Sequence, residues 1–150
     1  MAEAWRIVKE KHAATAFSGQ GAAKMGGRWN SRGVAVVYTS GTKSLAALET
    51  LVHLNPPVLF RYVAFHIEFD EALVETLDTL PPDWQAEPAG PSTKVLGDGW
   101  VREARSAVLG VPSIIISGEP NYLLNPAHSD FKKIAIGSLE AFAFDPRLLI

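Results

Sequence analysis

A glycine-rich segment and the residues that follow it contain the first groups that could do chemistry. Residues 26–30 read Gly-Gly-Arg-Trp-Asn, a β-branched run then leads to Tyr38, and a helical pattern carries Glu49 among leucines. An arginine that can hold an anion, aromatic rings that can stack and an isolated carboxylate thus lie within 22 positions. Loops rather than cores usually carry such groups. We therefore predict that this segment forms the active site.

The elements around this segment must position its side chains. Residues 4–8 predict a short strand, and the largely apolar residues 34–39 predict a second one, central in its sheet. Residues 43–54 predict a helix. Its apolar stripe consists of Leu45, Leu48, Leu51 and Val52. Glu49 is expected at the edge of this stripe, where a carboxylate can be partly buried and still reach a cleft.

The rest of the chain mixes strands and helices without regular alternation. Residues 58–69 alternate most clearly and predict a strand, and residues 99–109 predict a helix capped by Asp98. Shorter strands are expected at 114–117, 134–137 and 141–144, and loops at 12–27, 81–99 and 119–130. This order favours an α+β fold over a doubly wound α/β fold. The 150 residues predict a single domain with a mixed central sheet and flanking helices.

Composition excludes several classes of function. The formal net charge is −2, from 14 basic and 16 acidic residues, and the basic residues are scattered, so nucleic acid binding is not expected. The chain has no cysteine, which rules out disulfides, thiolate nucleophiles and cysteine-type zinc sites. The first residues lack a signal-peptide pattern, and no apolar stretch approaches the roughly 18 residues of a membrane span. A cytoplasmic protein without membrane contact is the expectation.

Familiar catalytic motifs are absent. The four histidines have no H-x-x-x-H spacing, so no metal site is predicted. A dinucleotide-type fragment at residues 19–21 has Lys24 in place of its third glycine, and neither a P-loop nor a G-x-S-x-G elbow occurs. Taken singly, each candidate also has an ordinary structural explanation: Arg28 as a solvated loop residue, or Glu49 as an exposed helix residue. Residue chemistry alone leaves a soluble α+β domain with an anion-binding loop.

The combination of motifs along the chain is more specific than its parts. In order, it comprises Trp5-Arg6-Ile7, residues 26–30, Gly33, residues 37–40, residues 45–54, residues 77–84, Val111-Pro112-Ser113, Glu119, Asn121-Tyr122, residues 124–126 and His128. This order, from Arg6 to about Phe131, resembles the RES domain family. The family is named for an arginine, a glutamate and a serine, which correspond here to Arg28, Glu49 and Ser113.

The resemblance implies a fold similar to that of ADP-ribosyltransferases and an enzyme that consumes NAD⁺. RES proteins are typically toxins of bacterial toxin–antitoxin pairs. The antitoxin is usually a separate chain with an Xre-like DNA-binding domain, and its C-terminal part covers the toxin's active site. No metal or separate cofactor is implied, because NAD⁺ is the substrate.

The resemblance also implies a role for each candidate residue. Glu49 would stabilise the positive charge that develops on the ribose when the nicotinamide bond breaks. Arg28, helped by Arg6, would bind the pyrophosphate with paired donors. Ser113 would hydrogen-bond the ribose or position Glu49. Tyr38 or Trp29 would provide a platform for the nicotinamide ring.

Three activities stay open at this stage. The chain could degrade NAD⁺ by hydrolysis or phosphorolysis, it could transfer ADP-ribose to a protein, or it could be a nucleotide-binding module without catalysis. The sequence does not identify the acceptor or the oligomeric state. It also assigns no role to His53, Asn121 or His128.

Overall fold

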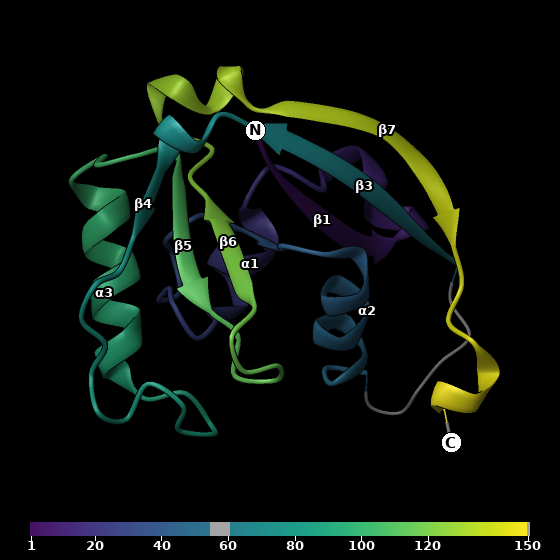
Figure 1. Cartoon of the computed structure of the whole chain (residues 1–150), viewed down its shortest axis with the longest axis horizontal. Coiled ribbons are helices and arrows are strands. Elements are labelled where there is room, and N and C mark those ends of the chain that lie inside the picture. The colour runs from purple at the N-terminus through teal and green to yellow at the C-terminus, as the bar shows by residue number, and fades with distance from the viewer. Residues whose placement is uncertain (55–60, 150) are drawn as a thin grey trace.

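A mixed seven-stranded sheet forms the centre of the computed structural model, which describes residues 1–54 and 61–149. The strands are β1 (Ala2–Lys9), β2 (Val37–Ser40), β3 (Tyr62–Phe69), β4 (Val74–Thr76), β5 (Val108–Pro112), β6 (Pro120–Leu124) and β7 (Ala135–Phe142). Their order in the sheet is β4-β5-β6-β2-β1-β3-β7 (Figure 1). Only the β4–β5 pair among these is parallel. The prediction of a single α+β domain with a mixed sheet is confirmed.

The helices flank this sheet. The α-helices are α1 (Gln20–Met25), α2 (Lys43–Leu51) and α3 (Pro91–Arg102), and short 3-10 helices cover Glu10–Thr15, Glu71–Leu73, Ser129–Lys133 and Pro146–Leu149. Helix α2 packs against β1 and β2, while α3 stands beside β4 and β5 at the other end (Figure 1). Within the described segments, no helix combines the length and the apolar composition needed to cross a membrane.

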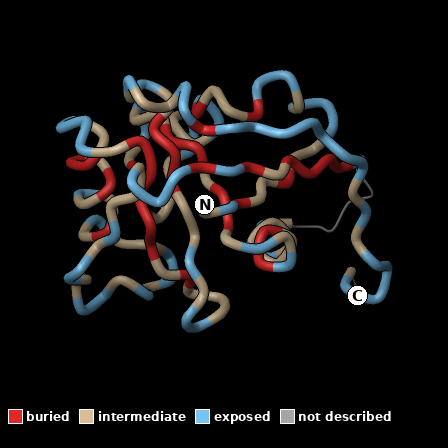
Figure 2. Tube along the Cα trace, turned by 45° about the horizontal axis from the view of Figure 1, so that its top comes forward, coloured by how far each residue is buried: buried red, intermediate tan, exposed pale blue. Residues whose placement is uncertain are grey.

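Apolar clusters hold both helices to the sheet. Trp100 of α3 packs in a cluster with Trp29, Val36, Leu109, Val111 and Leu123, and Ala46 of α2 packs in a cluster with Ile7, Tyr62 and Ala64. A third cluster, on the opposite face of the sheet, contains Ala4, Val37, Ile67, Phe69, Val108 and Leu124. Buried residues accordingly follow the central strands, whereas β7 is exposed along most of its length (Figure 2).

The glycine-rich segment of residues 26–30, called the arginine loop below, lies unusually close to α3. A Cβ atom at Gly97 would lie 1.6 Å from the backbone oxygen of Trp29, so no larger residue fits there. The loop is fastened on either side of this point, because Thr93 Oγ1 donates to the Arg28 oxygen (2.6 Å) and Ser31 donates to Asp98. The glycine-rich segment is therefore clamped by α3.

The predicted helix over residues 99–109 was wrong in its position. Helix α3 begins at Pro91 and ends at Arg102, and residues 108–112 form β5. Two glycines within α3, Gly97 and Gly99, weaken the helical pattern. Pro91 at the first helical turn was the available signal for the true start.

Several other predicted element boundaries also differ from those in the structure. Residues 114–117, predicted as a strand, form the turn between β5 and β6, which closes at Gly118 with φ 88°. The predicted loop 119–130 contains β6, the predicted loop 12–27 contains α1, and the two predicted C-terminal strands are the single strand β7. Of the predicted strand 58–69, residues 62–69 form β3, and residues 58–60 lie outside the described part, as do residues 55–57 after α2.

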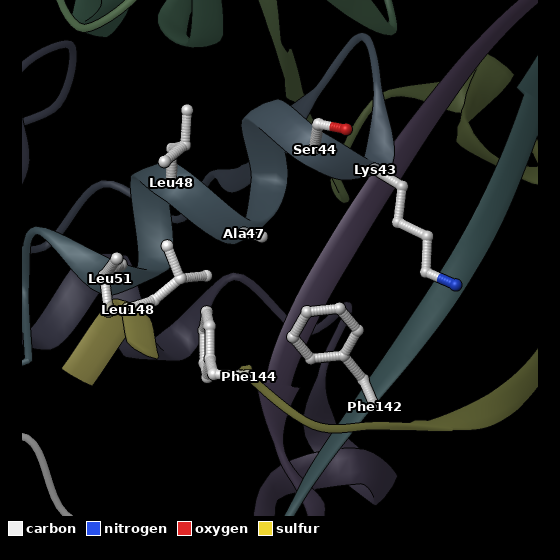
Figure 3. A pocket seen from close by; sticks show the side chains of 8 residues that line it. All are labelled: Lys43, Ser44, Ala47, Leu48, Leu51, Phe142, Phe144 and Leu148. Atoms are coloured by element: carbon white, nitrogen blue, oxygen red, sulfur yellow. The ribbon is translucent and has the colours of Figure 1, made fainter. Parts of the chain in front are cut away.

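Only part of the predicted apolar stripe of α2 is buried. The buried residues of the helix are Leu45 and Ala46, whereas Val52 is 58% exposed. Leu48 and Leu51 line a shallow groove of about 400 Å³ that is bordered by Phe142, Phe144 and Leu148 from the C-terminal segment (Figure 3). On the helical wheel Glu49 falls between the two buried residues, so its side chain points toward the sheet rather than along the edge of a stripe.

Candidate active site

The Glu49 carboxylate is held by two side chains from distant parts of the chain. Its Oε2 atom accepts a hydrogen bond from Ser113 Oγ at 3.1 Å and another from Asn121 Nδ2 at 2.5 Å. Glu49 comes from α2, Ser113 follows β5, and Asn121 lies in β6. The structure thus brings together two of the three predicted catalytic residues, Glu49 and Ser113.

The two carboxylate oxygens of Glu49 have different surroundings. Both donors bind Oε2, and no hydrogen bond from residues 1–54 or 61–149 reaches Oε1. Among the described residues, the Tyr62 hydroxyl is the only fully buried side-chain oxygen or nitrogen without a hydrogen-bond partner, so Glu49 Oε1 is accessible to a ligand. The arrangement fixes the carboxylate through one atom and leaves the other for chemistry.

Ser113 is limited to the role of a donor. Its hydroxyl oxygen accepts from the backbone N–H groups of Ile115 (3.0 Å) and Ile116 (3.2 Å), in the tight turn after β5. A serine hydroxyl has two acceptor positions and one proton, so that proton is directed to Glu49. Ser113 is only 2% exposed. Of the two roles expected for it, positioning of Glu49 is the one that this geometry supports.

Asn121 and Ser40 extend the hydrogen-bond network, and sequence reasoning gave neither a catalytic role. They are cross-strand partners between β2 and β6, and Ser40 Oγ donates to Asn121 Oδ1 at 2.8 Å. Ser40 is 4% exposed. The available signal was a pair of polar side chains inside the resemblance motif, one of them at the end of a largely apolar strand. The contact between the two residues can be predicted only when the pairing register of β2 and β6 is known.

Tyr38 fastens the arginine loop to the same face of β2 that carries Ser40. Its hydroxyl donates to Asn30 Oδ1 (2.7 Å) and accepts from the Trp29 backbone N–H (3.0 Å). Burial raises the pKa of Tyr38 well above its usual value, so the hydroxyl stays protonated. A Cβ atom at Gly27 would lie 2.5 Å from this hydroxyl. The glycine is therefore required for the loop to close over Tyr38.

Arg28 does not contact Glu49 or Ser113. Its guanidinium donates to the backbone oxygens of Trp84 (3.1 Å) and Ala86 (2.6 Å) and forms an ion pair with Glu87 (2.6 Å). The Arg28 side chain is 13% exposed and that of Glu87 is 73% exposed. The charge of Arg28 also acts on the Tyr38 hydroxyl, where it lowers the pKa against the larger effect of burial. Arg28 thus lies on the Tyr38 side of the site, bound to the loop before α3.

Arg6 and Trp29 are held in contacts within the protein rather than in open positions for a ligand. Trp5 pairs with Ser40, and the adjacent Arg6 therefore points to the opposite face of the sheet. The Arg6 guanidinium donates to the backbone oxygens of Ala16 (2.7 Å) and Tyr38 (2.8 Å), and burial lowers its pKa to about 10. Trp29 is 2% exposed, in the apolar cluster that packs on α3. Their roles toward NAD⁺ stay predictions.

The described residues contain no group of three or more histidine, aspartate or glutamate side chains that could hold a metal ion. His128 has a structural contact instead. Its Nδ1 atom accepts from the Asp130 backbone N–H at 2.9 Å and so caps the 3-10 helix Ser129–Lys133.

The model of the RES domain family matches residues 3–145, which is almost the whole chain. The chain belongs to the RES domain family. The match includes Arg28, Glu49 and Ser113, and therefore supports the resemblance drawn from the sequence motifs.

Curated relatives of this RES domain cover it from end to end. One is the Prs ADP-ribosylating toxin of Sphingobium sp. (strain YBL2), which is 42% identical over 97% of this chain and 95% of the relative. Another is Toxin Res of Yersinia enterocolitica, which is 38% identical over 96% of this chain and 97% of the relative. Toxin Res of Pseudomonas putida is 34% identical over similar shares of both chains.

The fold of this RES domain also matches a solved structure. A chain in the crystal structure of the M. tuberculosis MbcT–MbcA toxin–antitoxin complex superposes with a TM-score of 0.79 at 16% identity. The match covers 99% of this chain and 86% of the other. At this identity the likeness shows a shared fold.

Proposed function

We propose that this RES domain is the toxin of a toxin–antitoxin pair and that it breaks the nicotinamide–ribose bond of NAD⁺. The observation that carries the proposal is the Glu49 carboxylate, held through Oε2 by Ser113 and Asn121 with Oε1 left for substrate. The names of its relatives, which include Res toxins and an ADP-ribosylating toxin, support the same activity.

Cleavage of the nicotinamide–ribose bond suits a carboxylate that is held in place through one oxygen and has the other available to the sugar. When the bond between ribose C1′ and the ring nitrogen breaks, its electron pair leaves with nicotinamide and positive charge develops on the ribose. A carboxylate oxygen beside the sugar stabilises that charge and orients the 2′-hydroxyl, which donates to it. The oxygen of water or of phosphate then bonds to C1′ and releases its proton. Glu49 Oε1 is the group that we assign to the sugar.

Arg28 is assigned to the pyrophosphate of NAD⁺. Its guanidinium already binds an anion, because the Glu87 carboxylate lies 2.6 Å from it. A pyrophosphate would take the position of that carboxylate, while the contacts to Trp84 and Ala86 keep the guanidinium in place. In this proposal Tyr38 lies between the arginine and the carboxylate as the nicotinamide platform, and Arg6 supports the strand beneath it.

Replacing Glu87 with glutamine is expected to lower KM for NAD⁺ about threefold and to leave kcat unchanged, because the variant removes an exposed ion pair of modest strength. Steady-state nicotinamide release measures both constants. Glu103→Gln is the matched control, since Glu103 forms a similar exposed pair with Arg105 elsewhere on the surface. An unchanged or increased KM in Glu87→Gln would mean that Glu87 only holds the loop and that Arg28 does not meet the pyrophosphate.

The proposed activity is tested by measuring free nicotinamide over time, with purified protein, NAD⁺ and either water or phosphate as acceptor. Release of nicotinamide with free ADP-ribose supports hydrolysis, and release with phosphorylated ADP-ribose supports phosphorolysis. Stoichiometric NAD⁺ binding without nicotinamide release would overturn the proposal in favour of a nucleotide-binding module.

Transfer of ADP-ribose to a protein is the second candidate function. The 42% identical relative named as an ADP-ribosylating toxin favours it. Incubation with labelled NAD⁺ and a cell lysate separates the two candidates, because transfer yields a labelled protein band, whereas degradation yields labelled small molecules.

We also propose an antitoxin partner, a separate chain with an Xre-like DNA-binding domain that covers the face carrying Glu49. The shared fold with a chain from a toxin–antitoxin complex supports a partner of this kind. The purified antitoxin is expected to stop nicotinamide release at a one-to-one ratio.

A further inference from the structure

We infer that Asn121 is a positioning residue of the reaction and that Ser40 acts through it, so that the network Ser40–Asn121–Glu49 sets the carboxylate in its working orientation. This inference rests on the proposed cleavage of the nicotinamide bond. It adds two residues to the site that neither the RES motif nor the sequence pattern assigns to catalysis. Its basis is the set of contacts around Glu49 Oε2.

The direction of the Asn121 amide follows from the chemistry of its two neighbours. An ionised carboxylate only accepts hydrogen bonds, so the group that faces Glu49 at 2.5 Å must be the amide nitrogen. The amide oxygen then faces Ser40, whose hydroxyl donates to it at 2.8 Å. Ser40 thus holds the amide by its oxygen end, while the carboxylate, which only accepts, determines which end of the amide faces Glu49.

The β2–β6 pairing fixes this network in space. Ser40 and Asn121 are direct cross-strand partners, so they share a face and their Cβ atoms lie close together. Ser40 sits at the end of β2, and Thr42, two residues later, caps α2 by accepting from the Leu45 backbone N–H at 3.0 Å. The strand that holds Asn121 in orientation therefore leads directly into the helix that carries Glu49.

Ser113 and Asn121 reach Glu49 from different supports. Ser113 is fixed by the backbone of the turn after β5, through Ile115 and Ile116, whereas Asn121 is fixed by Ser40 on β2. Two donors on one oxygen restrict rotation of the carboxylate more than one donor does. Loss of the hydrogen bond from Asn121 is therefore expected to disturb the orientation of Oε1 and to reduce kcat, with little effect on the binding of the rest of NAD⁺.

The first test replaces Asn121. Asn121→Ala is expected to lower kcat about tenfold with KM changed less than twofold, a size typical of residues that orient a reacting group. Asn121→Asp has the same shape, keeps an acceptor toward Ser40 and places a carboxylate against Glu49. It is expected to lower kcat about thirtyfold, because two acceptors cannot bond to each other and like charges repel. A change confined to KM in both variants would overturn the inference.

The second test asks whether Ser40 acts through Asn121. Ser40→Ala is expected to lower kcat about threefold, and Ser40→Thr, which keeps the hydroxyl, is expected to restore most of it. The double variant Ser40→Ala/Asn121→Ala should be no slower than Asn121→Ala alone, since Ser40 then has nothing left to orient. Multiplicative losses in the double variant would show that Ser40 acts independently, which would overturn the network.

Thr39→Val is the matched control for loss of a buried hydrogen bond in the same strand. Thr39 is 4% exposed and its hydroxyl donates to the Tyr122 backbone oxygen at 2.8 Å, on the opposite face of β2. This variant is expected to lower Tm and leave kcat unchanged. An equal loss of kcat in Thr39→Val and Ser40→Ala would reduce the network to a general stability effect.

A readout without turnover separates failure of this inference from failure of the proposed function. Asn121→Asp is expected to lower Tm, and adding Glu49→Gln should restore it, because the glutamine supplies an amide donor to the new carboxylate. If the wild type releases no nicotinamide but the variants show this rescue of Tm, the proposed function is refuted and the contact is confirmed. If the wild type is active, the double variant shows no rescue of Tm and Asn121→Asp keeps its kcat, the inference is refuted and the proposed function stands.

Discussion

Replacing Glu49 with glutamine is expected to reduce nicotinamide release by about three orders of magnitude while the protein stays folded. The glutamine side-chain oxygen can still accept from Ser113 and Asn121, so the hydrogen bonds to Oε2 survive. The variant loses the negative charge and places an amide NH₂ where the free oxygen was. Stabilisation of developing charge by one well-placed group is typically worth about a hundredfold to a thousandfold in rate.

The measurement is single-turnover nicotinamide release, together with Tm as a check of folding. Glu49→Ala should be equally inactive but less stable, because it leaves the buried Ser113 hydroxyl and the Asn121 amide without their acceptor. A Glu49→Gln protein that consumes NAD⁺ at the wild-type rate would show that the carboxylate is not the group that stabilises the ribose.

Replacing Arg28 with lysine is expected to lower kcat/KM for NAD⁺ about a hundredfold, mainly through KM. A lysine ammonium is a point charge and does not reproduce the planar fork of donors that meets a pyrophosphate. The side chain also has a structural task, because it donates to the backbone oxygens of Trp84 and Ala86. A lower Tm is therefore expected together with the loss of activity.

Two comparisons separate the binding role of Arg28 from its structural role. Arg105→Lys is the matched control, since the Arg105 guanidinium likewise donates to carboxylate groups, those of Glu75 and Glu103, but outside the site. It should leave kcat/KM unchanged. Inorganic pyrophosphate should inhibit the wild type more strongly than Arg28→Lys. Equal inhibition of both proteins would show that Arg28 only supports the loop before α3.

The sequence was informative where the pattern was local. Strand β1, helix α2 and most of β3 follow from alternation, capping and periodicity within one segment. Residues 108–124 were assigned wrongly, because β5 and β6 have only five residues each and the apolar residues 114–116 lie in the turn between them. Their pairing partners, β4 for β5 and β2 for β6, are far away in the sequence. Local propensity contains no information about such partners.

The candidate site shows the same division. Glu49 and Ser113 were found through motif resemblance, and the structure brings them to 3.1 Å. Leu48, Leu51 and Val52 were predicted to face the sheet because a helical wheel gives the apolar side of a helix but not the element that packs against it. The C-terminal segment with Phe142 and Phe144 supplies that neighbour. Asn121 stayed without a role because its contact to Glu49 depends on which strand lies next to β2.

The order of the strands also sets when the protein can become active during its own synthesis. Glu49 is bonded by side chains that lie 64 and 72 positions further along the chain. A ribosome therefore completes α2 well before either donor exists, and β2 has to wait for β6 to pair on that side. Contacts this distant in sequence form late and slowly. A nascent chain that ends before Ser113 carries the carboxylate without the two groups that orient it, so the cell makes most of this polypeptide before it makes an active enzyme.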